Sequence, residues 1–261
     1  MGGRIEPDAV PRYRGAMVLG STFLGVDLAA DPKRTGIAQL RDDGTKIVIE
    51  NVRVGVDDDA IVSAIMGSRK AGVDVPFGWP RAFVELVQGH RTAALAPPPD
   101  TGPDWRREVL YRATDLEVRR RVGKTPLSVA ADKIAYPAIR WAAIAARLRE
   151  QGVPVTPDGR GVACEVCPGA ALAAWQLAGH PYKGAKNATS RSTLIERLSV
   201  RLPWLQWDGH RDACADDDNA LDAVIAALVA RDVHRGTAMP PPPELADLAA
   251  DEGWIWLPDG S

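Results

Sequence analysis

The sequence is poor in cysteine and histidine, with three cysteines and four histidines in 261 residues. Three cysteines cannot build a disulfide framework, so the chain has to fold on its hydrophobic core, as proteins of the reducing cytoplasm do. No apolar run reaches the ~18 residues of a membrane span. Residues 1–20 carry five charged side chains, unlike a secretory signal. These absences predict a cytoplasmic protein that does not enter the membrane.

Charge is balanced overall but unevenly distributed. The formal net charge is -2 at pH 7, so the chain lacks the general basicity of many nucleic-acid-binding proteins. Residues 105–124 carry seven basic and three acidic side chains, whereas residues 208–222 carry six aspartates and one arginine. A basic and an acidic segment in one chain suit a polyanion held beside a metal ion.

Hydrophobic patterning predicts a mixed α/β fold. An Asp42-Asp43-Gly44 turn indicates a hairpin between two strands, and Pro137 begins an amphipathic helix. Five strands are expected, at residues 22–28, 35–40, 46–54, 71–75 and 162–166. The clearest helices are expected at residues 57–66, 137–149, 168–177, 190–200 and 217–233. This order predicts a five-stranded sheet whose first three strands are antiparallel, with helices on its faces.

One domain is expected over residues 21–258, after a flexible leader at residues 1–20. Residues from about 81 to 136 show an irregular, partly helical pattern that is interrupted by three prolines at 97–99. We therefore predict a largely helical insertion there. The Gly253–Pro258 segment (GWIWLP) is predicted to form an aromatic plug near the end of the chain.

Carboxylates stand where several of these elements begin or end. Asp27 and Asp74 close two apolar strands, at the sheet edge where open α/β proteins place their ligands. Asp218 and Asp222 lie four residues apart and therefore on one face of the last long helix. If these side chains meet, their repulsion requires a cation, and oxygen ligands without histidine favour Mg²⁺ or Mn²⁺.

Structural roles compete with this interpretation. Aspartates at strand ends often cap turns, and the aspartates at residues 216–218 have the composition of a helix N-cap. Asp222 is harder to explain in this way because its helix is apolar nearly all round. Cys164 and Cys167 form a CxxC motif, but residues three apart on a strand face opposite ways, which favours buried thiols over a zinc site.

A set of short motifs resembles the family called domain of unknown function 429. The similarity extends from about residue 24 to residue 258. Its motifs are GVD (25–27), VDVPFG (73–78), RATD (112–115), CEVCP (164–168), YK (182–183), DNALDA (218–223) and GWIW (253–256).

That family is regarded as predicted nucleases of RNase H-like fold, so the resemblance implies phosphodiester hydrolysis of nucleic acid with Mg²⁺ or Mn²⁺. The residues carried over as metal ligands are Asp27, Asp74, Asp218 and Asp222. Glu165 joins them as a catalytic candidate with no assigned role. Arg112 and Lys183 are expected near the site, where each would bind a substrate phosphate or pair with a carboxylate. Asn219 departs from the family, which commonly has a second aspartate there.

Two other functions remain open. A catalytically silent binding domain would keep the fold, as Asn219 and the negative net charge suggest. A nucleotide-binding module of the actin and sugar-kinase type is suggested by the GVD motif before Lys33 and Thr35. The chain has no second glycine-rich phosphate loop, which counts against this alternative.

Overall fold

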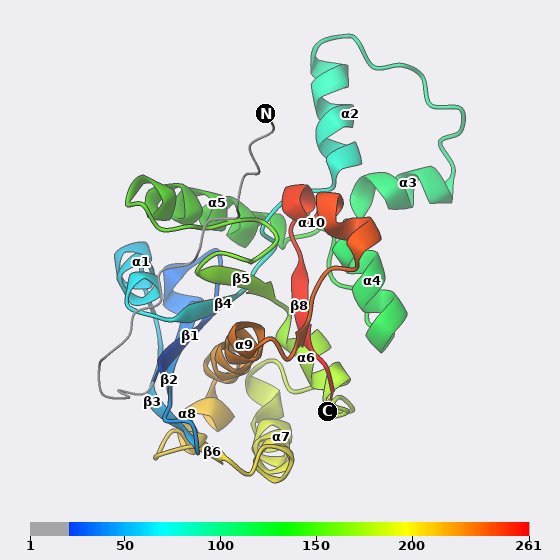
Figure 1. Cartoon of the computed structure of the whole chain (residues 1–261). Coiled ribbons are helices and arrows are strands. Elements are labelled where there is room, and N and C mark those ends of the chain that lie inside the picture. Colours follow the sequence, from blue (N-terminus) through cyan, green and yellow to red (C-terminus); the bar gives the residue numbers. More distant parts are fainter. Residues whose placement is uncertain (1–20, 261) are drawn as a thin grey trace, which may run out of the picture.

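A computed structural model describes residues 21–260, and its central feature is a mixed sheet of eight strands (Figure 1). In this part of the chain the strand order is β6-β3-β2-β1-β4-β5-β8-β7. The strands are β1 (Ser21–Asp27), β2 (Gly36–Asp42), β3 (Ile47–Val54), β4 (Lys70–Asp74), β5 (Ala163–Val166), β6 (Leu205–Gln206), β7 (Ala238–Met239) and β8 (Ile255–Pro258). As predicted, the first three strands are antiparallel. β4, β5 and β8 run parallel to β1.

The sheet is larger than the five strands expected from the sequence. β6 and β7 contain two residues each, which is too short for an alternating pattern. The segment expected to be an aromatic plug contains β8, which pairs with β5. All four residues of β8 are buried, and a strand that is buried on both faces shows no alternation of apolar and polar residues.

Helices cover both faces of the sheet. Among the residues described, the α-helices are α1 (Asp58–Met66), α2 (Arg81–Arg91), α3 (Pro103–Leu110), α4 (Ala113–Val122), α5 (Ala135–Glu150), α6 (Pro168–Ala174), α7 (Ala188–Arg201), α8 (Arg211–Asp216), α9 (Asp218–Arg235) and α10 (Ala246–Glu252). Short 3₁₀-helices are η1 (Pro32–Arg34), η2 (Ala185–Asn187) and η3 (Pro243–Leu245). α1 and α5 lie on one face, and α9 lies on the other with α6, α7 and α8 around it (Figure 1).

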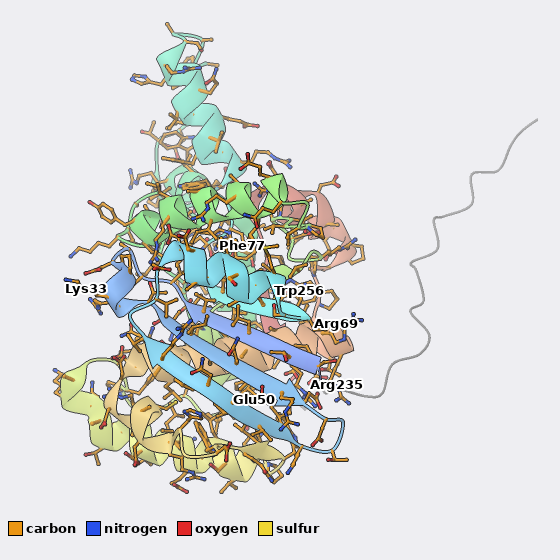
Figure 2. All side chains as sticks on the ribbon, turned by 90° about the vertical axis from the view of Figure 1, so that its left-hand side faces the viewer. Lys33, Glu50, Arg69, Phe77, Arg235 and Trp256 are labelled. Carbon is orange, nitrogen blue, oxygen red and sulfur yellow. The ribbon has the colours of Figure 1, made fainter. Side chains whose placement is uncertain are left out.

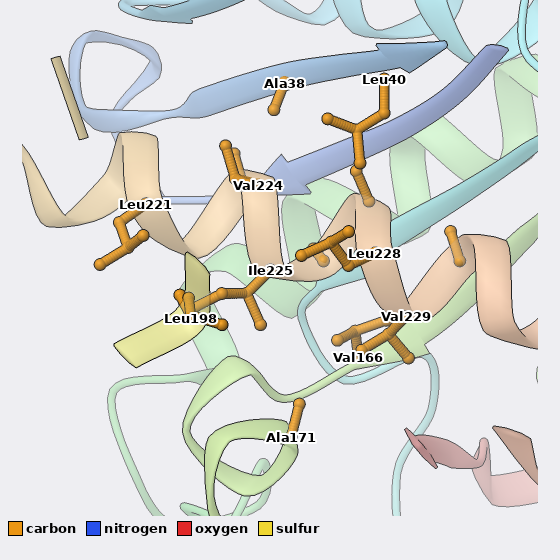
Figure 3. Close-up of a cluster of buried hydrophobic side chains, with 14 of the residues drawn as sticks. Ala38, Leu40, Val166, Ala171, Leu198, Leu221, Val224, Ile225, Leu228 and Val229 are labelled. Carbon is orange, nitrogen blue, oxygen red and sulfur yellow. The ribbon is translucent and has the colours of Figure 1, made fainter. Parts of the chain in front are cut away.

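The larger core surrounds α9. Every residue from Ala220 to Ala230 is buried, because the sheet packs on one side of this helix and α6, α7 and α8 pack on the others. Figure 3 shows Val224 of α9 beside Ala38 of β2, and Ile225 beside Leu198 of α7. α9 is therefore a central helix, which explains why its sequence is apolar nearly all round.

The second core lies between the sheet and the α1–α5 pair. Val26 and Val73 of neighbouring strands face this side with Ile61 of α1. Trp141 of α5 is 2% exposed and stacks on Phe77, with 4.5 Å between the ring centroids. Phe77 follows β4 directly, so this contact helps to hold the chain at the carboxyl end of that strand.

The segment expected to be a helical insertion contains α2, α3 and α4. α2 has no buried residue and projects with the connection to α3 away from the sheet (Figure 1). α4 instead packs against α6 and α10. The leader expected at residues 1–20 lies outside the described residues.

The two ends of the sheet carry different groups. Figure 2 shows Lys33 at one end of β1 and β2, and Arg69 and Arg235 at the other. The Lys33 end is the carboxyl end of β1, because η1 follows that strand. Glu50 lies between them on β3, exposed on the outer part of the sheet.

Candidate metal centre

Two aspartates lie side by side at the carboxyl end of the sheet. β1 and β4 are parallel neighbours, and their register pairs Asp27 with Asp74. In each strand the residues just before this aspartate are apolar and buried, residues 23–26 in β1 and 71–73 in β4, so the carboxylate marks the point where the chain leaves the core. This is the edge at which parallel α/β sheets place their ligands.

α9 reaches these strands because both carry glycine on the face that it covers. Gly25 and Gly72 are paired in the register. A Cβ added to Gly25 would lie 1.8 Å from the Ala223 carbonyl oxygen, and one added to Gly72 would lie 2.2 Å from the Ala226 carbonyl oxygen. The helix backbone therefore rests directly on the strands, and this contact fixes how closely Asp222 approaches them.

The result is a triad of carboxylates from three elements. Asp27, Asp74 and Asp222 each offer one oxygen, and these oxygens lie within 4.8 Å of one another. Asp222 is completely buried, while the other two are partly exposed. The structure thus brings together three of the four side chains expected as metal ligands.

Asp222 has one oxygen with a regular hydrogen bond and one without. Its Oδ1 accepts a hydrogen bond of 2.8 Å from the Tyr182 hydroxyl. Its Oδ2 lies 2.6 Å from Nζ of Lys183 but accepts no hydrogen bond of regular geometry from the described residues. Lys183 therefore forms an ion pair inside the triad, the carboxylate pairing that the sequence left open for this residue.

Arg191 of α7 holds the segment that carries Tyr182 and Lys183. Its guanidinium is buried and donates to the carbonyl oxygens of Tyr182 and Gly184, each at 2.8 Å. It also donates to the carbonyl oxygens of Ala215 and Asp216, just before α9 begins. One side chain therefore ties the lysine segment to the helix that supplies Asp222.

The role of Arg191 could not be predicted from the sequence. Arg191 is one of many arginines, and it contacts only backbone oxygens whose positions depend on the fold. The only available signal was an arginine on a face of α7 that also carries Leu194, Ile195 and Leu198.

Burial and mutual repulsion disfavour the ionised form of the triad. Burial, together with the charges of Asp222 and Asp74, raises the pKa of Asp27 well above its usual value. Burial likewise raises the pKa of Asp74 to about 7, against an opposing effect of Lys183. Although burial lowers the pKa of Lys183, the three aspartates outweigh it and raise this pKa. The cluster thus stabilises positive charge.

A divalent cation fits these donors. Three carboxylate oxygens converge, and the buried Asp222 Oδ2 has no regular hydrogen-bond donor. Neither histidine nor cysteine belongs to the group, so the donors are hard oxygens that suit magnesium-like ions rather than zinc. A lysine ammonium now provides part of the positive charge that such an ion would supply.

The fourth expected ligand, Asp218, lies at the edge of the cluster. It is in the first turn of α9, one turn before Asp222, and its Oδ1 accepts a hydrogen bond of 3.2 Å from the Gly184 amide. Its charge raises the pKa of Asp27, so it contributes to the negative potential of the site. It does not belong to the group of converging oxygens.

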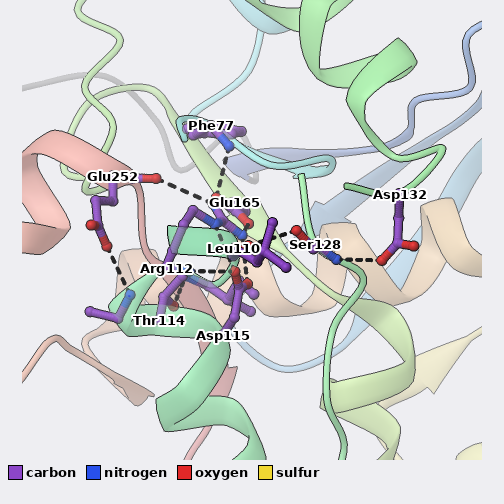
Figure 4. A network of polar contacts seen from close by, with 11 residues as sticks. Phe77, Leu110, Arg112, Thr114, Asp115, Ser128, Asp132, Glu165 and Glu252 are labelled. Carbon is purple, nitrogen blue, oxygen red and sulfur yellow. Dashed lines mark hydrogen bonds and ion pairs between the residues drawn. The ribbon is translucent and has the colours of Figure 1, made fainter. Parts of the chain in front are cut away.

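Glu165 and Arg112 form a separate buried network with Asp115 (Figure 4). Arg112 is 1% exposed. Its five N–H groups donate to Glu165, to Asp115 and to the Glu252 carbonyl oxygen. No donor is left for a substrate phosphate, so the geometry supports the carboxylate pairing, one of the two roles expected for Arg112.

Glu165 has a structural position in this network. Its Oε2 also accepts a hydrogen bond of 2.9 Å from the Phe77 amide. It therefore links α4 to the loop after β4, three residues beyond Asp74. Burial raises the pKa of Glu165, although the Arg112 charge opposes this. Its effect on the triad is through the field at Asp74, whose pKa it raises.

The residues that suggested a nucleotide-binding module do not form a phosphate cradle. Thr35 is fully buried, and its hydroxyl accepts a hydrogen bond of 2.6 Å from Arg140. Lys33 lies in the exposed helix η1. Both residues have local structural explanations.

These features describe an α/β protein with a cluster of aspartates at the carboxyl edge of its sheet that could hold a metal ion. The chain belongs to the family described as "Protein of unknown function (DUF429)", whose model matches residues 25–245. No curated protein and no solved structure matches the chain. The family resemblance expected from the motifs is therefore confirmed, whereas the RNase H-like fold stays a prediction.

No helix in the described part of the chain is long and apolar enough to cross a membrane. The longest, α9, owes its apolar character to burial in the core.

Proposed function

We propose that the protein is a nuclease that uses Mg²⁺ or Mn²⁺ to hydrolyse phosphodiester bonds of nucleic acid. The observation that supports it best is the convergence of Asp27, Asp74 and Asp222 from two strands and a helix. Three carboxylates in one place are unfavourable for folding unless a cation is present. A protein that keeps them has a use for that cation.

Each residue of the cluster has a part in this proposal. The aspartates hold the ion, which when bound polarises a phosphate oxygen and lowers the pKa of a water molecule. Asp218, on the rim, orients water or a second ligand through its free oxygen. Lys183 is 56% exposed and long enough to turn from Asp222 toward a phosphate, where its charge would stabilise the transition state.

The proposal is tested with conservative variants of the triad. Asp27→Asn and Asp222→Asn should each lose thermal stabilisation by millimolar Mn²⁺. Cleavage of labelled single-stranded and duplex DNA and RNA should fall by more than about 100-fold. Mutation of residues that only hydrogen-bond to metal ligands already lowers metal affinity or activity by about 10–100-fold. Asp212→Asn is the matched control, since this aspartate is exposed on α8. Full cleavage by the triad variants, or by the wild type in a chelator, would reject the proposal.

A binding domain without catalysis is the second candidate. The ion pair between Lys183 and Asp222 favours it, because the lysine neutralises part of the cluster from within the chain. The same metal titration separates the two functions: binding to the native state must raise its stability, so an unchanged melting temperature in Mn²⁺ would support the binding domain.

A further inference from the structure

A pocket of about 670 Å³ opens beside the triad. Tyr182 and Lys183 line it and also contact Asp222, so pocket and triad share a wall. The opposite walls come from α6 and α7. This volume is typical of a site for one small organic molecule rather than for a folded partner.

The pocket combines an apolar floor with a polar rim. Leu172, Leu177 and Leu194 are each at most 7% exposed and form the apolar floor. Thr189 and Thr193 present hydroxyl groups from exposed positions on α7. Such a lining suits a planar heterocycle with polar edges, attached to a sugar.

Lys124 adds an unpaired cation to the rim. Within the described residues it forms no hydrogen bond or ion pair, and its charge lowers the pKa of Asp74. The nearby Arg197 is different, since it donates to the carbonyl oxygens of Leu177 and Gln176. Lys124, and Lys183 once it turns from its ion pair with Asp222, are thus the two ammonium groups that an anion in the pocket would meet.

Gly169 makes room for Lys124. A Cβ added to Gly169 would lie 2.1 Å from Nζ and 3.0 Å from Cε of Lys124, and the three atoms nearest to it all belong to this lysine. The glycine is buried in α6, where alanine would be the better helix former. Its missing side chain is the space in which the lysine lies.

We infer that this pocket takes the base and sugar of an unpaired nucleotide beside the scissile phosphate, with Lys124 and Lys183 on the flanking phosphates. The substrate class is then single-stranded nucleic acid. This inference rests on the proposed function. A base within a duplex cannot reach a pocket of this kind without leaving its partner, and the loss of pairing and stacking disfavours that step.

Blocking the pocket tests the inference. Thr193→Trp places a large ring in it, and Ser192→Trp places the same ring on the neighbouring exposed position of α7, which does not line the pocket. The readout is fluorescence anisotropy of a fluorescein-labelled octathymidylate in Ca²⁺. We expect Thr193→Trp to weaken binding at least tenfold and Ser192→Trp to leave it within twofold.

Removing or displacing the lysine is the second test. Lys124→Ala should weaken binding and lower the slope of log affinity against log salt by about one, as the loss of one phosphate contact does. Gly169→Ala should give the same result with Lys124 still present, because the new methyl group occupies its place. Lys133→Ala, at an exposed position away from the pocket, should change neither quantity.

The outcomes separate the assignment of the pocket from the proposed nuclease function. Metal-dependent cleavage with equal affinity for octathymidylate and its duplex, or with no effect of Thr193→Trp, overturns the pocket assignment and leaves the nuclease in place. Pocket-dependent binding of the single strand without any cleavage rejects the nuclease but keeps the binding site. Absence of octathymidylate binding by the wild type overturns the inference outright.

Discussion

At the scale of single residues, the triad places function and stability in conflict. A buried carboxylate with a raised pKa favours the folded state only while it is protonated. Asp27 and Asp74 both have raised pKa values because of burial and neighbouring aspartates. The protein without metal is therefore less stable than a version lacking one of these charges.

We predict that Asp74→Asn is more stable than the wild type at neutral pH in a chelator. The pKa of Asp74 is about 7 in the folded protein against an ordinary value of 3.8. The free-energy cost of ionising this buried carboxylate is therefore absent below pH 4 and grows as the pH rises toward 7. The difference in the free energy of unfolding between Asp74→Asn and the wild type should reach about 1–3 kcal/mol. Urea denaturation at pH 4 and pH 8 measures it. A gap that does not widen with pH would contradict the assigned shift.

Lys183→Gln should separate metal binding from cleavage. Removing a positive charge 2.6 Å from an Asp222 oxygen leaves more negative potential, so the Kd for Mn²⁺ should fall by about tenfold, the effect of roughly one pKa unit of charge interaction. Cleavage should nevertheless fall at saturating Mn²⁺, because the phosphate loses a cation. Calorimetry and single-turnover kinetics measure the two effects. Unchanged cleavage would make Lys183 a charge-balancing residue only.

At the scale of elements, the site depends on how closely α9 approaches β1 and β4. The contact is between backbones, with glycines on the strands and alanines on the helix. A larger side chain cannot be accommodated by a change of rotamer, since the obstructing atoms are a carbonyl oxygen and an amide nitrogen. The helix itself would have to move.

Gly25→Ala is therefore expected to destabilise the protein by about 3 kcal/mol or more, as overpacked cores do. The new Cβ would lie 1.8 Å from the Ala223 carbonyl oxygen, so α9 would shift and carry Asp222 away from Asp27. Gly67→Ala is the matched control, because its Cβ would meet nothing closer than 3.6 Å. Urea denaturation and Mn²⁺ titration should both show the difference, and a fully stable Gly25→Ala protein would disprove this packing.

Arg191→Lys tests the link between the lysine segment and α9. A lysine cannot reach all four carbonyl oxygens. Each buried acceptor left without a hydrogen bond would lower the free energy of unfolding by about 1–3 kcal/mol. We expect lower stability together with weaker Mn²⁺ binding, since Tyr182 and Lys183 would lose their fixed place beside Asp222. Arg197→Lys, on the exposed side of the same helix, is the comparison. Unchanged Mn²⁺ affinity would limit Arg191 to a folding role.

At the scale of the whole molecule, metal binding and folding should be coupled through protons. Carboxylates bind a cation only when ionised, and burial keeps Asp74 protonated up to about pH 7. The rise in melting temperature on adding Mn²⁺ should therefore be larger at pH 8 than at pH 6. Differential scanning calorimetry at a fixed Mn²⁺ concentration measures this, and an equal rise at both pH values would contradict it.

Long elements and strand-end acids were predictable from the sequence. The first three strands, β4, β5 and α9 were predicted within a few residues, the strands from apolar runs between turn or proline signals and α9 from its long apolar pattern. Asp27 and Asp74 were predicted as site residues because they lie at the ends of strands. β6 and β7 were missed because two residues show no pattern, and β8 was missed because its aromatic segment was interpreted as a plug rather than as a strand.

The partners of the site residues could not be read from the sequence. Arg112 bonds Glu165, which lies 53 positions further along the chain. Arg191 donates only to backbone carbonyl oxygens. Such contacts have no periodic signature. They arise only after helices and strands are placed in space.

The position of β8 has a consequence for synthesis on the ribosome. β8 follows the other seven strands of the described sheet in the sequence, yet it fills the place between β5 and β7. A nascent polypeptide that ends before Ile255 leaves β5 with an open edge, which invites pairing with another molecule. Pulse proteolysis of ribosome-bound chains stalled at different lengths should show protection of the strands only once Trp256 of β8 has left the exit tunnel.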